Sequence, residues 1–203
     1  MKVESFIAII CVNCLHFSDI TYLYYADFIQ VEFNFRKFYG GPHKYDKVIL
    51  LVRDPFDTLL AEWNRQNSGE SHTGIASIKS FSDKNKWKRY VAKELMLWQN
   101  FYTYYVDEYR LDQLHILQYE KLKLNLGLEM KKVLNFLGLD FDKNVELCVM
   151  QKQKGSFKRP KSSINYKQFF TKAQNNTIEA SKKIVYSRLG LTELTEQIEN
   201  KEN

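Results

Sequence analysis

The sequence predicts an α/β domain in which a parallel sheet is covered by helices. Two short apolar runs support this prediction, residues 47–52 (KVILLV) and residues 114–119 (LHILQY), and a segment with helical spacing follows each run. Apolar runs without polar alternation are typical of strands that are buried on both faces of a parallel sheet. Helices that alternate with such strands pack on the two faces of that sheet.

The whole chain has a globular composition with a basic balance. Its 203 residues are 44% hydrophobic and 27% charged, with a net charge of +6, which suits one domain and an anionic partner. Residues 147–178 contain seven Lys or Arg and no Asp or Glu. A local anion site is therefore favoured over a uniformly basic surface, and the alternative is a solvated basic loop.

The first part of the chain contains two apolar stretches. Residues 6–17 are shorter than the roughly 20 residues of a transmembrane helix. Residues 28–35 alternate between apolar and polar side chains, as a strand does. The three cysteines, Cys11, Cys14 and Cys148, are an odd number, so no disulfide framework is expected.

Five helices are expected after the first strand. Asp54-Pro55 is a helix-start signal, because Asp caps a helix and Pro suits its first turn, and this helix is expected to end near Asn67. A polar loop at 68–83 precedes a long helix at about 84–109, whose aromatic residues are expected in the core because they recur at helical spacing. The helices expected after the second strand are residues 122–138, 144–150 and 177–189.

Arg53 is the main candidate for a binding residue. It lies at the carboxyl end of the first strand, where parallel sheets bind their ligands. The helix that starts there is expected to present free N–H groups and the positive end of its dipole to an anion. A guanidinium group fits a phosphate in two-point contact. The alternative is a structural Arg53–Asp54 pair that fixes the turn.

Several further motifs follow Arg53-Asp54-Pro55 along the chain. They are Tyr119-Glu120-Lys121-Leu122, the run NFLGL at 135–139, and a basic loop, Lys154-Gly155-Ser156-Phe157-Lys158-Arg159. Gly155 lets the backbone approach a ligand, and Ser156, Lys158 and Arg159 supply donors. In this order the motifs resemble the sulfotransferase family, and most of all the sulfotransferases of WSC-domain-containing proteins. The resemblance covers about residues 44–190 and includes AEWNR at 61–65 and FTKAQN at 170–175.

The resemblance implies a P-loop-like, three-layer α/β/α fold that is incomplete at the N-terminus. It implies transfer of a sulfuryl group from 3′-phosphoadenosine 5′-phosphosulfate, a co-substrate, to a hydroxyl or amine. It divides the chain into an atypical segment (1–43), a partial sulfotransferase domain (44–190) and a polar tail (191–203). By this resemblance Arg53 would bind the 3′-phosphate, and the loop that would close over the phosphate and the adenosine consists of Gly155, Ser156, Phe157, Lys158 and Arg159.

The sequence departs from the family where the 5′-phosphosulfate should bind. Gly40 and Gly41 lead into Pro42-His43-Lys44, which does not form a phosphate loop, and no GxxxxGK[ST] motif exists. We therefore expect poor turnover or none, from a fragment or from a non-catalytic nucleotide-binding or interaction protein on the same fold. His43 and Glu62 are nearest to the place of a catalytic base, but neither is assigned that role. No metal site is expected.

The resemblance also implies partners and a location. The expected partners are the nucleotide sulfate donor and a hydroxyl or amine acceptor, for which a glycan is a candidate. A nucleic-acid partner is not expected, because the sequence has no RRM, KH, zinc-finger or helix-turn-helix signature. Relatives of this type are membrane-anchored, so the resemblance implies the Golgi membrane as the expected location, and the cytoplasm is the alternative.

Overall fold

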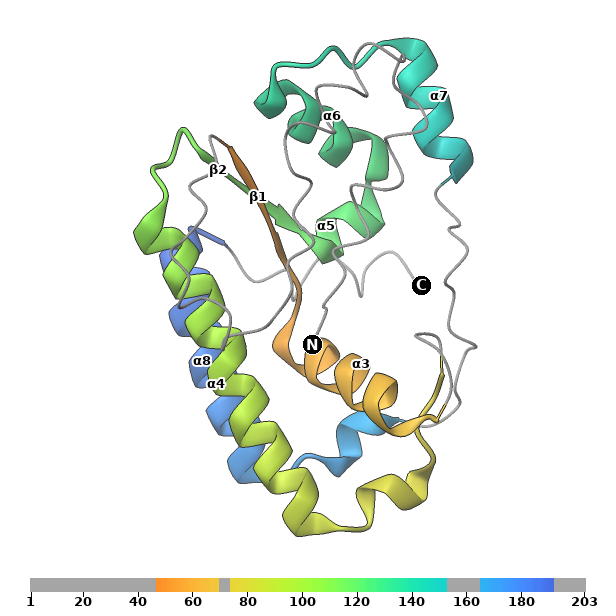
Figure 1. Ribbon diagram of the computed structural model, residues 1–203, viewed down its shortest axis with the longest axis vertical. Helices are drawn as coiled ribbons and strands as arrows, with labels where there is room; N and C mark the ends of the chain where they lie inside the picture. Colours follow the sequence, from red (N-terminus) through yellow and green to blue (C-terminus); the bar gives the residue numbers. More distant parts are fainter. Residues whose placement is uncertain (1–46, 70–73, 153–164, 192–203) are drawn as a thin grey trace, which may run out of the picture.

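The computed structural model describes residues 47–69, 74–152 and 165–191 (Figure 1). Within these ranges two strands, β1 (Val48–Val52) and β2 (Leu114–Gln118), pair in parallel. The register places Val48 opposite Leu114 and Val52 opposite Gln118, so both strands end at the same edge. The predicted α/β class with a parallel sheet is confirmed, and both strands lie where the apolar runs placed them.

Helices follow both strands, and several begin at side-chain caps. Helix α3 (Pro55–Asn67) follows β1, and α4 (Lys84–Glu108) is the expected long helix. After β2 come α5 (Tyr119–Leu124), α6 (Leu126–Leu137), α7 (Lys143–Lys152) and α8 (Lys172–Leu189). Two short 3₁₀ turns, η2 (Ile78–Phe81) and η3 (Tyr166–Phe169), precede α4 and α8.

Several helix boundaries differ from the sequence prediction, and α5 begins at Tyr119, which was expected to end the second strand. The single helix expected at 122–138 is two helices, because Asn125 leaves the helical conformation and its side chain accepts a hydrogen bond from the N–H of Leu128. Helix α8 begins five residues before the expected start at 177. Thr171 and Gln174 form a capping box there, in which each side chain bonds the other's backbone N–H.

The sheet lies between two layers of helices. Figure 1 shows α4 and α8 running side by side on one side of the strands, with α5, α6 and α7 toward the other side. Alternate side chains of β1 point to the two layers, as the pleat of a strand requires. Val48, Leu50 and Val52 pack in the cluster that includes α4 and α8, whereas Ile49 and Leu51 pack against the cluster built by α6 and α7.

Helix α4 holds the end of β1 through its aromatic side chains. The Trp98 indole N–H donates to the carbonyl of Arg53 at 3.3 Å, and the Tyr102 hydroxyl donates to the carbonyl of Leu51 at 2.9 Å. The predicted role of the α4 aromatics as core is confirmed, with Phe101 only half-buried. These two hydrogen bonds also fix the backbone at Arg53, the main candidate residue.

The structure also bears on the cysteines and on whether a helix could cross a membrane. Cys148 in α7 is disulfide-bonded, so the expectation from the odd cysteine count was wrong for this residue. The other two cysteines, Cys11 and Cys14, lie outside the described residues. Among the helices that the structure describes, none combines the length and the apolar character that crossing a bilayer would need.

Candidate functional site

The carboxyl ends of the two strands bring Arg53 and Tyr119 together. Arg53 directly follows β1, and Tyr119 directly follows β2. Because Val52 is paired with Gln118, the next residue of each strand lies at the same edge of the sheet. The guanidinium carbon of Arg53 lies 4.8 Å from the centre of the Tyr119 ring, in cation–π contact. This contact orients the plane of the guanidinium group.

The Arg53 side chain has few polar partners. Among the described residues its nearest carboxylate is that of Asp57, one turn into α3, at 4.0 Å, which is the outer limit of an ion pair. Its buried Nε has no hydrogen-bond partner among the residues that the structure describes. A buried guanidinium N–H without a partner is costly unless a ligand supplies an acceptor. About a third of the side chain, 34%, remains exposed.

The alternative, a structural pair between Arg53 and Asp54, is not what the described residues form. One Asp54 oxygen accepts hydrogen bonds from the N–H groups of Phe56 at 2.9 Å and Asp57 at 3.4 Å, as an N-cap does. The other oxygen lies 3.0 Å from the ammonium group of Lys182 in α8. Because both Asp54 oxygens are engaged elsewhere, Asp54 does not hold the guanidinium group.

The start of α3 offers less to an anion than the sequence predicted. Pro55 at the first position has no N–H, the N–H groups of Phe56 and Asp57 bond Asp54, and that of Thr58 bonds the Asp54 carbonyl at 2.9 Å. The expectation of free N–H groups in this first turn was wrong, because the capping carboxylate takes them. What remains for an anion is the Arg53 guanidinium group and the positive end of the helix dipole.

Glu120 ties the two strand ends together. It lies in the first turn of α5, and its Oε1 accepts a hydrogen bond from the N–H of Asp54 at 2.9 Å. Its other oxygen is buried and has no partner within the described part of the chain. Nearby, burial raises the pKa of the Tyr186 hydroxyl, and the charges of Glu120 and Asp54 raise it further.

The basic loop predicted to close over the nucleotide lies outside the described residues. Gly155, Ser156, Phe157, Lys158 and Arg159 fall between the last residue of α7 and the start of η3. Their predicted role in binding therefore stays a prediction, and so does that of Arg53. His43, considered for the catalytic base, also lies outside the described ranges.

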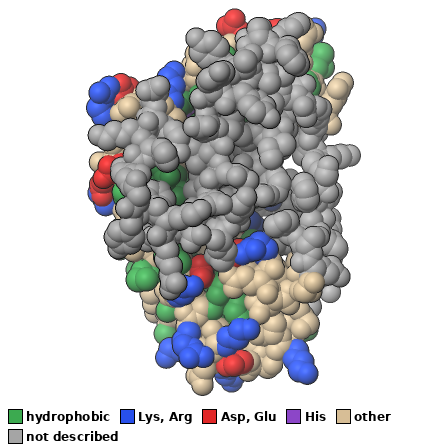
Figure 2. All heavy atoms as spheres, in the orientation of Figure 1, with side chains coloured by type: hydrophobic (Ala, Val, Ile, Leu, Met, Phe, Trp, Pro, Cys, Tyr) green, Lys and Arg blue, Asp and Glu red, His purple; other side chains and the backbone are tan. Residues whose placement is uncertain are grey.

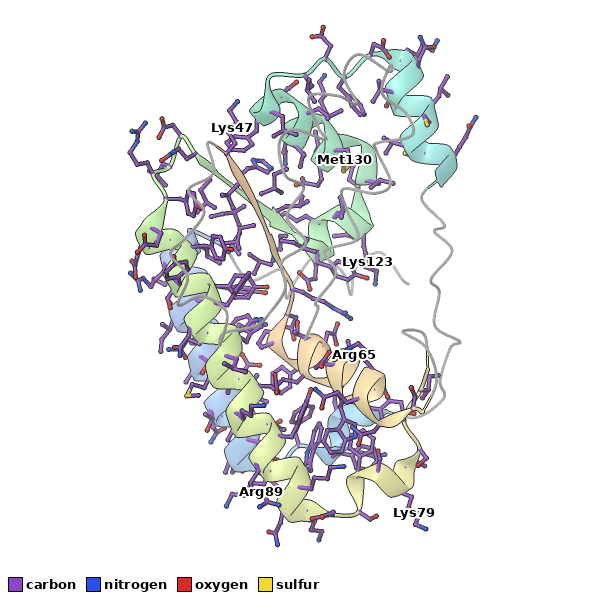
Figure 3. The ribbon with its side chains drawn as sticks, viewed as in Figure 1. Lys47, Arg65, Lys79, Arg89, Lys123 and Met130 are labelled. Atoms are coloured by element: carbon purple, nitrogen blue, oxygen red, sulfur yellow. The ribbon has the colours of Figure 1, made fainter. Side chains whose placement is uncertain are left out.

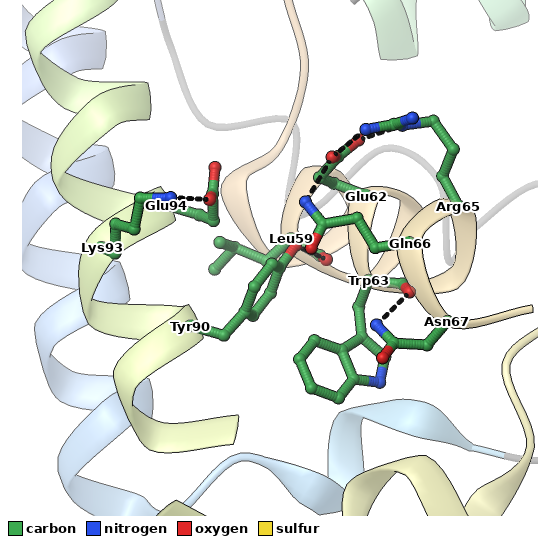
Figure 4. A network of polar contacts seen from close by, with 9 residues as sticks. All are labelled: Leu59, Glu62, Trp63, Arg65, Gln66, Asn67, Tyr90, Lys93 and Glu94. Atoms are coloured by element: carbon green, nitrogen blue, oxygen red, sulfur yellow. Dashed lines mark hydrogen bonds and ion pairs between the residues drawn. The ribbon is translucent and has the colours of Figure 1, made fainter. Parts of the chain in front are cut away.

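Glu62 is engaged by side chains of its own helix. Its two oxygens accept hydrogen bonds from Arg65 at 2.7 and 2.6 Å, and one of them also accepts from Gln66 at 2.6 Å (Figure 4). Across from it on α4 lies Glu94, whose pKa is raised chiefly by burial. Since Arg65 forms a two-point pair with Glu62 and occupies both of its oxygens, no catalytic role is assigned to this carboxylate.

Positive charge also gathers away from the strand ends. Figure 2 shows several Lys and Arg side chains at the end of the molecule where α4 begins, and Figure 3 places Lys79 and Arg89 there. The chain thus has a basic surface region at the start of α4 in addition to the basic run predicted at residues 147–178. Its exposed members are Lys79, Lys84, Lys86, Lys88, Arg89 and Lys93.

Lys182, the buried partner of Asp54, was not predicted from the sequence. A signal for it exists, because Lys182 shares a helical face with Ile178, Val185 and Leu189, all of which are buried. A lysine on the apolar face of a helix requires a partner, since lysine is almost never buried without one. Within the described ranges, no group of three or more His, Cys, Asp or Glu side chains could hold a metal ion.

Comparisons with known proteins agree with the motifs. The family model described as "Sulfotransferase domain" matches residues 43–185. Similar proteins include WSCD family member GA21586 of Drosophila pseudoobscura pseudoobscura, 32% identical over 149 residues that cover 72% of this chain and 46% of that protein. Another is WSCD family member CG9164 of Drosophila melanogaster, 28% identical over 151 residues, covering 73% and 46%.

Among solved structures, mouse sulfotransferase SULT7A1 complexed with PAP is similar at 14% identity and a TM-score of 0.49, over 69% of this chain and 58% of that one. The chain spans about half the length of the curated relatives it matches, 46% for the two named. The predicted resemblance, including that to the WSC-domain group, is confirmed. With a family model that covers most of the chain, the protein belongs to the sulfotransferase family.

Proposed function

We propose that this domain binds the sulfate donor 3′-phosphoadenosine 5′-phosphosulfate and that Arg53 holds the 3′-phosphate of that nucleotide. The observation that carries the proposal is the state of the Arg53 side chain. It is partly buried at the carboxyl ends of two parallel strands, with an Nε that has no partner among the described residues. A phosphate would supply the missing acceptor through two-point contact with the guanidinium group.

The surroundings of Arg53 suit a phosphate. The Tyr119 ring lies against the guanidinium group and limits its rotation, so that less side-chain freedom is lost when a ligand binds. The Asp57 carboxylate is 4.0 Å away, far enough for a phosphate to compete with it for the guanidinium donors. Helix α3 adds the positive end of its dipole.

The chemistry proposed for the domain is that of its family. The oxygen or nitrogen of the acceptor would attack the sulfur atom, the bond from sulfur to the bridging phosphate oxygen would break, and the proton of the acceptor would pass to water. The products are a sulfated acceptor and adenosine 3′,5′-bisphosphate. Arg53, Tyr119 and the α3 dipole would position the nucleotide for this step without touching the reacting atoms. Gly155, Ser156, Phe157, Lys158 and Arg159 would close over the nucleotide.

Calorimetry with adenosine 3′,5′-bisphosphate and AMP tests the proposal. We expect the full chain to prefer the bisphosphate, because only that ligand carries the 3′-phosphate. Arg53→Ala should weaken bisphosphate binding by at least about tenfold, since a hydrogen bond to a charged group contributes ~1.5–3 kcal/mol. Binding of AMP should change little. Arg53→Lys should recover only part of the loss, because lysine lacks the planar fork.

Arg89→Ala is the matched control for the loss of one positive charge. Arg89 is an exposed arginine on α4, at the end of the molecule where that helix begins (Figure 3). It should bind both nucleotides as the unmodified chain does. Equal affinity for the two nucleotides, or an Arg53→Ala variant with full preference for the bisphosphate, would overturn the proposal. Bisphosphate binding without sulfuryl transfer would support the alternative, a non-catalytic nucleotide-binding protein on this fold.

A further inference from the structure

Lys182 is a buried lysine that reaches the candidate site from α8. It is 8% exposed, and its ammonium nitrogen lies 3.0 Å from Oδ2 of Asp54 and 5.5 Å from the centre of the Tyr186 ring. Taking a lysine out of water is costly, so its position calls for a compensating charge. Asp54 supplies that charge while its other oxygen caps α3.

The ion pair between Lys182 and Asp54 affects how an anion would bind, because Arg53 is surrounded by carboxylates. In the described part of the chain the nearby carboxylates are those of Asp54, Asp57 and Glu120. Each of them would repel a phosphate that approached the guanidinium group. Besides Arg53, the described cations near this segment include Lys182, the exposed Lys123, 5.9 Å from the centre of the Tyr119 ring, and the exposed Lys167, 5.9 Å from the centre of the Phe56 ring. Of these cations, all in the described ranges, Lys182 is the one that forms an ion pair with the carboxylate of Asp54.

We propose that Lys182 is a positioning residue for the nucleotide's 3′-phosphate, and that it acts through Asp54. Its charge offsets that of the Asp54 carboxylate, so that Arg53 meets the phosphate with less repulsion. Its ion pair also holds the carboxylate where it caps α3, directly after Arg53. The inference rests on the proposed function, because it assumes that Arg53 binds the phosphate.

Two substitutions separate charge from packing. Lys182→Met keeps a long apolar side chain and removes the charge, which leaves the Asp54 carboxylate without its partner on α8. Asp54→Asn removes the opposing charge and keeps a side-chain oxygen that caps a helix as well as aspartate does. If Lys182 acts by offsetting the charge of Asp54, the double variant should bind nucleotide better than Lys182→Met alone. A purely packing role for Lys182 predicts no such rescue.

The experiment is calorimetry on the full chain and its variants with adenosine 3′,5′-bisphosphate, and with AMP for comparison. We expect Lys182→Met to weaken bisphosphate binding about tenfold, and AMP binding less, because the repulsion acts on the 3′-phosphate. Asp54→Asn/Lys182→Met should return to within about threefold of the unmodified chain, and Lys182→Arg should bind like it. The loss in Lys182→Met should shrink at high salt, because salt screens the charge of Asp54.

Asp54→Asn alone keeps the inference testable if Lys182→Met does not fold. It raises the positive charge beside Arg53 by one, so bisphosphate should bind more tightly, by about threefold at low salt. Weaker or unchanged binding in Asp54→Asn, unchanged binding in Lys182→Met, or a double variant no better than Lys182→Met would each overturn the role of Lys182. If the unmodified chain does not prefer the bisphosphate, the proposed function fails, and this inference fails with it. If bisphosphate binding is lost in Arg53→Ala but unchanged in Lys182→Met, this inference fails and the proposed function stands.

Discussion

Three buried tyrosine hydroxyls predict how the stability of the domain responds to alkaline pH. Tyr90, Tyr102 and Tyr186 are each less than a tenth exposed. Burial is the largest cause that raises the pKa of each hydroxyl above the ordinary value of about 10. Nearby carboxylates raise the pKa of Tyr90 and Tyr186 further, because a second negative charge would lie close to them.

The sign and size of the effect follow from proton binding. Below pH ~10 each hydroxyl is protonated in both the folded and the unfolded chain, so the full stability is present. Above that pH the unfolded chain loses the proton while the folded chain keeps it, so the free energy of unfolding falls as pH rises. At pH ~11 each tyrosine accounts for a loss of about 1.4 kcal/mol, or about 4 kcal/mol for the three. That is a large part of the roughly 5–15 kcal/mol typical of a domain.

Urea unfolding followed by tryptophan fluorescence, at several pH values from about 9 to 11, measures this loss. Tyr102→Phe provides the internal test. At neutral pH it should cost about 1 kcal/mol, because the hydroxyl donates to the carbonyl of Leu51. Its free energy of unfolding should fall less steeply above pH ~10, so that its stability approaches that of the unmodified chain near pH ~11. Tyr104→Phe is the control on the same helix, and it should flatten the profile less because Tyr104 is more exposed.

One result would refute the reasoning: a free energy of unfolding that stays constant between pH ~10 and ~11, which would mean that the buried hydroxyls ionise in the folded state. A Tyr102→Phe profile parallel to that of the unmodified chain would remove Tyr102 from the explanation.

Three further substitutions test the packing and the helix ends by urea unfolding. Trp63→Ala should cost about 3–5 kcal/mol, because the ring is 1% exposed and packs edge-on against Trp87 at 4.9 Å; a cost under ~1 kcal/mol would contradict its place in the core. Gly138→Ala should cost about 1 kcal/mol from backbone strain alone, since φ is 79° and, beyond the adjacent residues, no atom in the described part of the chain lies within 4 Å of an added Cβ; a stabilised variant would contradict that conformation. Asp83→Ala should cost about 1 kcal/mol by removing the cap of α4, and Asp83→Asn should not.

Local sequence patterns account for much of the fold. The apolar runs located both strands, and Asp54-Pro55 located the start of α3, because these signals depend on neighbouring residues only. The break between α5 and α6 was missed, since the apolar periodicity continues across Asn125 and only its backbone geometry shows the interruption. The capping box at Thr171 is written in the sequence, but the expected start at 177 passed over it.

The sequence likewise predicted part of the candidate site and not the rest. The sequence pointed to Arg53, because an arginine directly after a buried strand and before a helix start lies where parallel sheets bind ligands. It also suggested free N–H groups in the first turn of α3, which Asp54 takes instead. The contact of Arg53 with Tyr119 could not be read from spacing, because it depends on the pairing of β1 with β2.

By itself the sequence determined the order of strands and helices, the position of Arg53 and the family resemblance, since each is a property of short, local patterns. Only the tertiary structure decided which charges meet. Asp54 pairs with Lys182 and not with Arg53, and its N–H bonds Glu120, because the packing of α8 and α5 around the end of β1 brings these residues together. An ion pair between residues so distant in the chain depends on that packing, and local sequence propensities carry no information about it.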